Sequence, residues 1–129
     1  MTPEPKWGLL ACGHSGQTAV DVDQSCGPEQ LFAIELSTPT WSLCFRISDP
    51  AIVQTLASFL QPGPEESLLI GTFGDFPVEV RRDREYGDRF FMTIGASCAR
   101  AQLTIAGERQ ISELIAALTQ AVEDLTDRP

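Results

Sequence analysis

Residues 41–60 read WSLCFRISDPAIVQTLASFL, and residues 99–118 read ARAQLTIAGERQISELIAAL. Each stretch opens with alternating apolar and polar side chains, the pattern of a half-buried β-strand. In the first stretch the pattern changes at Asp49-Pro50, where aspartate is a good N-cap and proline suits the first helical position. In the second stretch it changes after Gly107. Both stretches therefore predict a strand that leads directly into a helix.

Each predicted helix carries a single apolar stripe. In the first helix the stripe consists of Val53, Leu56, Ala57 and Leu60, and Pro62-Gly63-Pro64 ends the helix. The second helix runs from Glu108 to Leu125, with a stripe made of Ile111, Leu114, Ile115, Leu118, Val122 and Leu125. Spacings of three and four place such residues on one side of a helix. Each helix is expected to cover one face of its own sheet.

Short segments with period-two alternation make up most of the remaining chain, and turn residues separate them. The apolar members of these predicted strands are Val20 and Val22, Phe32, Ile34 and Leu36, Leu68 and Ile70, Val78 and Val80, Phe90, Met92 and Ile94, and Leu103 and Ile105. Strands joined by short turns predict antiparallel pairing.

The two halves align at a constant shift of 58 residues, which gives nine identities in the 53 pairs from Leu9 to Gln61. Random pairing at average composition would give about three. The shift pairs Gly13 with Gly71 and Val20 with Val78, and it keeps both the strand phase and the helix phase. Because a slip of one residue turns a strand inside out, we interpret this agreement as an internal duplication.

We therefore predict one α+β domain over residues 1–129, with internal repeats at approximately 9–61 and 67–125. Each repeat reads ββββα, so we expect antiparallel sheets with one helix per repeat. A half of this size buries too little surface to be stable alone, and the repeats should share one core about a pseudo-two-fold axis. An unpaired sheet edge would let the chain form a homo-oligomer, most simply a homodimer.

The tandem ββββα unit resembles the repeat of PUR-type and Whirly-type single-strand nucleic-acid binders. The runs Trp41 to Leu60 and Ala99 to Leu118 carry this resemblance, which covers nearly the whole chain as a matter of topology. It implies a surface that binds single strands through basic and aromatic groups. This chain departs from that composition because it is acidic.

The formal net charge is −9, and the pI is about 4.4. Such a chain repels phosphate backbones, which makes nucleic acid an unlikely partner, while a basic protein is a suitable one. No run approaches the roughly 20 apolar residues of a membrane span, and the N-terminal run Trp7 to Cys12 is shorter than a secretory signal requires. We expect a cytoplasmic protein with no membrane partner. Its four cysteines imply no disulfides in that setting.

Strand phase predicts which side chains face away from the helices. In the first repeat these are Asp21, Asp23, Glu35, Ser42, Cys44 and Arg46, and in the second Glu79, Arg81, Phe91, Thr93, Arg100, Gln102 and Thr104. Residues 1–80 carry a net charge of −8, whereas residues 81–129 carry −1. The first repeat is therefore expected to present the acidic surface.

Four of the nine basic residues lie between Arg81 and Arg89, with aromatic residues beside them. Phe90 is expected in the core. Arginines that contact phosphate and rings that stack on bases would form a single-strand site, whose candidate residues are Arg81, Arg84, Tyr86, Arg89, Phe91 and Arg100. Asp83, Glu85 and Asp88 interrupt the run, so a hairpin tip laced with ion pairs is the simpler interpretation.

Cys12, His14 and Cys26 are weak candidates for a zinc site, with Asp21 or Asp23 as a further ligand. No Cys-x-x-Cys pair is present, and we predict no metal and no cofactor. No nucleophile motif accompanies the single histidine, so we do not expect an enzyme. The sequence favours a non-catalytic interaction protein with a protein partner, and a basic partner would suit its charge. Single-stranded nucleic-acid binding by the second repeat is the alternative.

Overall fold

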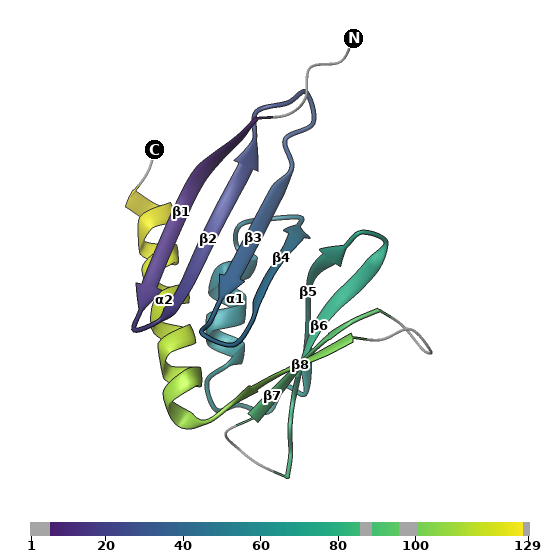
Figure 1. Ribbon diagram of the computed structural model, residues 1–129, viewed down its shortest axis with the longest axis vertical. Helices are drawn as coiled ribbons and strands as arrows, with labels where there is room; N and C mark the ends of the chain where they lie inside the picture. The colour runs from purple at the N-terminus through teal and green to yellow at the C-terminus, as the bar shows by residue number, and fades with distance from the viewer. Residues whose placement is uncertain (1–5, 86–88, 96–100, 128–129) are drawn as a thin grey trace.

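The computed structural model describes residues 6–85, 89–95 and 101–127. Within these residues the elements follow one another as Figure 1 shows: β1 (Trp7–Ser15), β2 (Thr18–Ser25), β3 (Phe32–Ser37), β4 (Ser42–Ile47), α1 (Ile52–Phe59), β5 (Ser67–Phe73), β6 (Phe76–Arg82), β7 (Arg89–Ile94), β8 (Ala101–Ala106) and α2 (Glu108–Asp127). The predicted α+β class is confirmed, as is the antiparallel pairing of the strands.

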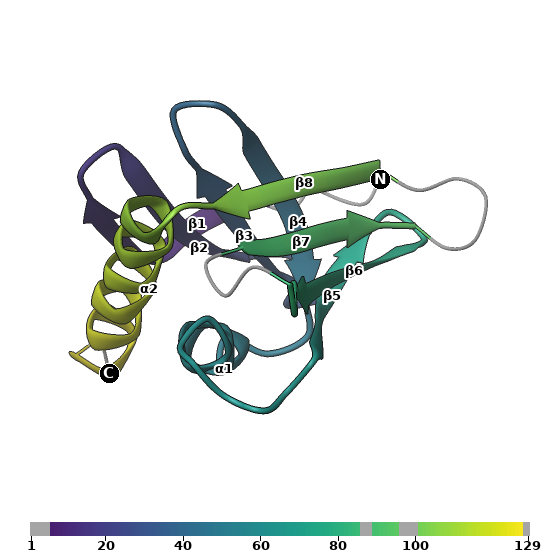
Figure 2. The same cartoon turned by 90° about the horizontal axis from the view of Figure 1, so that it is seen from below.

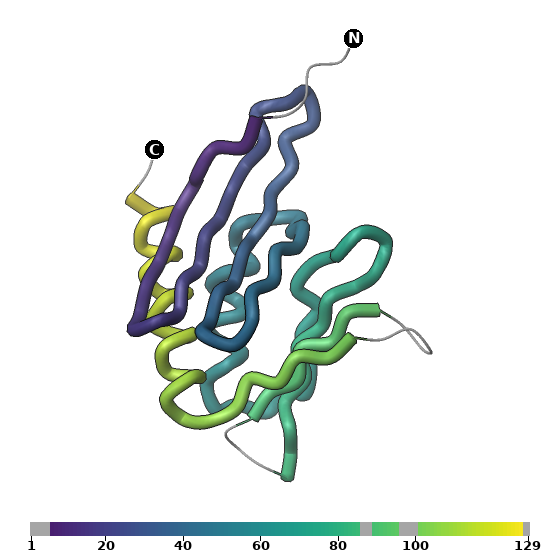
Figure 3. The backbone as a smooth tube through the Cα atoms, viewed as in Figure 1, coloured from purple at the N-terminus to yellow at the C-terminus, as the bar shows by residue number. Residues whose placement is uncertain are grey.

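The strands form one continuous sheet in the order β1 to β8, rather than the separate sheets expected from the sequence. The junction between β4 and β5 consists of a single residue pair, Arg46 with Thr72. Figure 3 shows that β1 to β4 run side by side, whereas β7 and β8 cross their direction. The sheet is continuous because β5 runs antiparallel to β4 and pairs with it. Since the β4–β5 junction is only one residue pair wide, the strands that follow can turn away from the direction of β1 to β4.

Strand registers coincide under the 58-residue shift beside the β1–β2 and β5–β6 turns and in the next two strand pairs of each half, whereas the bulges in β1 and β5 fall at non-corresponding positions. Val20 pairs with Gly13 and Leu36, and Val78 pairs with Gly71 and Ile94. Phe45 pairs with Ile34, as Leu103 pairs with Met92. The turns between β1 and β2 and between β5 and β6 place Gly16 and Gly74 at φ values of 58° and 61°. Both turns thus use the left-handed conformation that glycine adopts without a steric penalty.

Both helices lie on the same side of β1 to β4, as Figure 2 shows. The inward-facing strand residues and the helix stripes form one core cluster, which includes Val22, Leu36, Phe90 and Leu118. Phe90 is buried as expected. The opposite face of β1 to β4 carries no helix, so its side chains meet solvent.

Helix α2 packs against β1 and β2, in the half opposite to its own. The expectation that each helix covers its own sheet is wrong for α2, and α1 likewise packs against β5 of the other half. Gly13 permits this packing, because a Cβ atom there would overlap the Ala117 carbonyl oxygen. No sequence pattern indicated that α2 would pack on the other half, since an apolar stripe specifies that a helix is covered but not by which strands.

Helix α1 begins later than its sequence signals suggest. Asp49 Oδ1 accepts a hydrogen bond from the Ala51 N–H at 2.9 Å, and the regular helix starts at Ile52. It ends at Phe59, before Pro62-Gly63-Pro64 as predicted. Helix α1 is therefore short, at eight residues against 20 for α2, and it packs against α2 and β5.

Candidate functional site

The uncovered face of β2 to β4 gathers carboxylates from neighbouring strands. Asp21 pairs directly with Glu35, which pairs with Cys44 on the next strand. Asp23 lies two residues from Asp21 on the same face of β2. We call Asp21, Asp23 and Glu35 the acidic face. Its three carboxylates form no ion pair within the described ranges.

The environment of the acidic face favours the protonated form of Asp23. Partial burial raises the pKa of Asp23 above its ordinary 3.8, and the neighbouring charges of Asp21 and Glu35 raise it further. Partial burial also raises the pKa of the Cys44 thiol, and the negative charges of Glu35 and Asp23 raise it further. The face therefore concentrates negative charge, and an incoming cation would relieve the repulsion within it.

Two large apolar side chains border the acidic face on β1. Leu9 pairs directly with Asp23 and is 51% exposed, and Trp7 is 48% exposed. Residues two apart on a strand share a face, so Trp7 lies on the same side of the sheet as Leu9. Sequence reasoning missed both residues. The polar residues opposite them on β2 could have indicated their exposure.

The corresponding face of the second half has a different character. Arg81 pairs across the strands with Phe91, which in turn pairs with Thr104. Arg81 also lies 3.4 Å from the Glu79 carboxylate. Thr93, which was expected to face solvent, is only 6% exposed, because this short side chain lies between the cross-strand neighbours Glu79 and Gln102.

The remaining candidates for nucleic-acid contact are also paired or undescribed. Arg84 forms an ion pair with Glu66. Arg89 lies 2.8 Å from the Asp83 carboxylate, and its guanidinium stands 5.5 Å from the centroid of the Phe91 ring. Tyr86 and Arg100 fall outside the described residues. The structure thus brings Arg81, Arg89 and Phe91 close together, but each of the two arginines already pairs with a carboxylate of this chain.

The three metal candidates do not converge. Cys26 follows Ser25, which pairs with Trp7, whereas Cys12 lies farther along β1 and pairs with Asp21. His14 is exposed two residues beyond Cys12. In the described part of the chain, no group of three or more His, Cys, Asp or Glu side chains is arranged to hold a metal ion.

Side chains of α2 cover the outer edge of β1. Gln120 Oε1 accepts a hydrogen bond from the His14 N–H at 2.6 Å, and Asp124 Oδ2 accepts one from the Cys12 N–H at 3.1 Å. At the other edge, Gln110 Oε1 accepts a hydrogen bond from the Ala106 N–H of β8. The edge of β8 from Ala101 to Ile105 has no neighbouring strand in the described sheet.

Arg82, which was not among the site residues predicted from the sequence, has its side chain held in place by several neighbours. Arg82 donates from Nη2 to the Phe59 carbonyl at 2.7 Å and from Nε to the Glu65 carbonyl at 2.9 Å. Its guanidinium also stands over the rings of Phe59 and Phe90. Strand phase could have identified it, because Arg82 continues the inward-facing series of Val78 and Val80.

No helix among the described residues is long and apolar enough to span a bilayer. Comparison with protein-family models, with curated proteins and with solved structures finds no match to this chain.

Proposed function

We propose that this chain is a non-catalytic interaction protein whose acidic face binds a basic segment of a protein partner. The observation that carries the proposal is the packing of Asp21, Asp23 and Glu35 on an uncovered sheet face without a cation in an ion pair among the described residues. Like charges on neighbouring strands destabilise a sheet, and bound lysine or arginine would offset that cost.

Apolar contact at the border of the acidic face supports a protein partner rather than a simple counterion. The exposed side chains of Trp7 and Leu9 can enter apolar depressions on a partner, while the carboxylates orient its basic groups. Tryptophan is a frequent energetic centre of protein interfaces. We expect the charges to govern the association rate and Trp7 to govern dissociation.

The finer architecture forms part of the same proposal. We infer two ββββα repeats related by a pseudo-two-fold axis, and the coincidence of strand registers under the 58-residue shift supports this inference. The matched glycine turns support it too. The repeats differ in helix length, which would follow if the second half had extended its helix over the first half's strands.

Single-strand nucleic-acid binding by the second half, in line with the PUR and Whirly resemblance, remains the alternative. The adjacency of Arg81 and Phe91 favours it, since it places a cation beside a ring. Fluorescence anisotropy with labelled single strands at low salt tests it, because electrostatic affinity is greatest there. Absence of binding under those conditions would exclude it. A cytoplasmic location and a homo-oligomeric state also stay predictions.

The main proposal is tested with immobilised full-length protein and a panel of basic, acidic and neutral peptides, at about 50 mM and about 300 mM salt. We expect basic peptides that contain apolar residues to bind most strongly, and their binding to weaken at the higher salt. Equal binding of acidic and basic peptides would contradict the proposal.

A matched pair of variants locates the binding surface. The triple substitution D21N/D23N/E35Q removes three charges from the acidic face, whereas E29Q/E65Q/D75N removes three exposed charges elsewhere. We expect the first variant to lose about tenfold in affinity for a basic peptide and the second to change it much less. Similar losses in both would mean that net charge alone attracts the peptide.

A further inference from the structure

An open groove of about 870 Å³ lies on the helix side of the sheet, away from the acidic face. Leu60 and Pro62 form one wall, Ile111 and Ile115 of α2 form the other, and Phe90 contributes from β7. This volume falls within the range of about 300–1,000 Å³ typical of small-molecule sites, which are mostly apolar with a few fixed polar groups. The groove has such a lining.

Arg82 is the cation of this groove, and the structure holds its side chain in one orientation. Two backbone carbonyls accept hydrogen bonds from Nη2 and Nε, at Phe59 and Glu65 respectively. The guanidinium carbon lies 5.0 Å from the Phe59 ring centroid and 5.2 Å from that of Phe90. A guanidinium has five N–H donors, so this arrangement leaves donors for a further acceptor.

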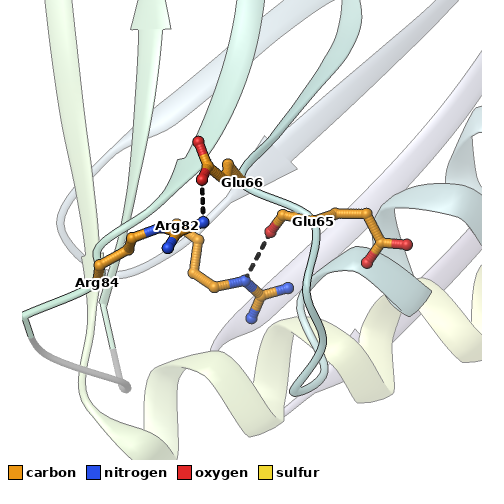
Figure 4. A network of polar contacts seen from close by, with 4 residues as sticks. All are labelled: Glu65, Glu66, Arg82 and Arg84. Carbon is orange, nitrogen blue, oxygen red and sulfur yellow. Dashed lines mark hydrogen bonds and ion pairs between the residues drawn. The ribbon is translucent and has the colours of Figure 1, made fainter.

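The charge of Arg82 is not neutralised by a carboxylate. Arg81, Arg84, Arg89 and Arg109 each form an ion pair, whereas Arg82 has none in the described residues. Figure 4 shows that Glu65 meets Arg82 through its backbone carbonyl while its carboxylate points away, and that the Glu66 carboxylate meets Arg84. Arg46 also lacks an ion pair among the described residues, but Arg82 is the arginine that lines the groove and whose guanidinium is held by two carbonyls.

The geometry points to a binding site for a small amphiphilic carboxylate, such as a medium-chain fatty acid. Its hydrocarbon body would lie between α1 and α2 against Leu60, Ile111 and Ile115, and its carboxylate would accept hydrogen bonds from Arg82. Arginine suits this role because its planar donors match the two oxygens of a carboxylate. The exposed hydroxyl of Ser112 lines the same groove.

Glu108 also lines the groove and opposes an anion there. The carboxylate of the ligand must therefore meet Arg82 while its body separates it from Glu108. It follows that E108Q should strengthen binding of the carboxylate. A purely structural role for Arg82, as a clasp between β6 and the end of α1, makes no such prediction.

The full-length protein is titrated with decanoate below its micelle concentration, while backbone amide shifts are followed by NMR. Decyltrimethylammonium tests the hydrocarbon body with the opposite charge, and acetate tests the head group alone. We expect saturable shifts centred on Phe90, Ile111 and Ile115, and at least about tenfold weaker binding of the cationic amphiphile. Net charge would favour the cation, so equal or tighter binding of the cation would overturn the proposal.

Two variants identify the groove as the site. R82Q should weaken decanoate binding by about tenfold. S112W fills the groove from an exposed position and should abolish binding without disturbing the core. If R82Q unfolds the chain, as circular dichroism would reveal, S112W and E108Q decide. Retention of decanoate binding by S112W, or no gain of affinity in E108Q, would reject the site.

Discussion

The hairpins β1–β2 and β5–β6 have the same register beside the turn and the same glycine turn, but their helix-facing surfaces differ in exposure. At the β1–β2 turn, Thr18 is 1% exposed, and its hydroxyl lies 3.4 Å from Glu113 Oε2 of α2. At the β5–β6 turn, Phe73 and Phe76 occupy the corresponding positions and are each 48% exposed. The two hairpins thus present a covered surface in one half of the chain and an open one in the other.

Helix length accounts for the difference between the hairpins. Helix α2 has 20 residues and reaches from the β1–β2 turn to Cys12 in the middle of β1. Helix α1 stops at Phe59, because Pro62-Gly63-Pro64 cannot continue it. A local stop signal therefore determines which strands of a distant hairpin face solvent.

The largest expected effect concerns the covered hairpin. In Gly13→Ala, the new Cβ would overlap the Ala117 carbonyl oxygen, so α2 would have to move away from β1. We expect the free energy of unfolding to fall by at least about 2 kcal/mol, measured by denaturant titration.

Gly74→Ala is the control for Gly13→Ala. Its Cβ would meet no atom within 4 Å, but its φ of 61° disfavours alanine. We expect a loss of about 1 kcal/mol from backbone strain alone. Equal losses in the two variants would mean that close approach of α2 contributes nothing at Gly13.

The next effect concerns the equivalent glycine of the open hairpin. In Gly71→Ala, the Cβ would overlap the Arg46 carbonyl oxygen and lie 2.8 Å from the Phe45 ring. We expect a loss of about 1–2 kcal/mol, smaller than for Gly13 because β4 and β5 join at one residue pair and can shift. Amide exchange should become faster at Arg46 and Thr72. Unchanged exchange there would refute this account.

A smaller effect is expected when two residues of the open hairpin β5–β6 are replaced by the residue types found at the corresponding positions of β1–β2. The double substitution F73S/F76T introduces the residue types of Ser15 and Thr18. Because both rings are half exposed, the free energy of unfolding should change by no more than about 0.5 kcal/mol. Binding of a hydrophobic dye to the folded protein should decrease markedly. A large loss of stability would show that the rings are packed rather than open.

The smallest effect concerns Asp23, whose counterpart in the other half is Arg81. The folded state raises the pKa of Asp23 above 3.8, so it binds a proton more tightly than the unfolded state. This contribution to stability therefore declines as pH rises through the window above 3.8. Asp23→Asn should be more stable at neutral pH by less than about 0.5 kcal/mol. The advantage should vanish below that window, and an advantage that grows in acid would contradict this sign.

Local patterns predicted the strands, the acidic face and the direction that most strand residues face, with Thr93 as an exception, because alternation reports directly on burial. Asp21, Glu35 and Cys44 lie outward as their phase required. The exchange of α2 could not be predicted, since it depends on a distant contact at Gly13. The position of the β-bulge could not be predicted either. It falls between Leu9 and Ala11 in β1 but between Leu69 and Gly71 in β5, and this leaves Leu69 61% exposed where Ala11 is buried.

The candidate site was only partly predictable for a similar reason. The sequence identified the cluster of arginines between Arg81 and Arg89, but it did not predict the ion pair of Arg84 with Glu66. Glu66 directly precedes β5, far from Arg84 in the sequence. It also passed over Arg82, whose role depends on the Phe59 carbonyl. Charge partners far apart in sequence need the fold before they can be assigned.

The hydrogen bonds from Cys12 and His14 to α2 have a consequence for assembly. They occupy main-chain donors that an incoming strand would need at Cys12 and His14, so this part of the β1 edge resists pairing with another chain. The described edge of β8 from Ala101 to Ile105 carries no such side-chain contacts in the structure, so strand-to-strand association, where it occurs, is favoured at β8 over this part of β1.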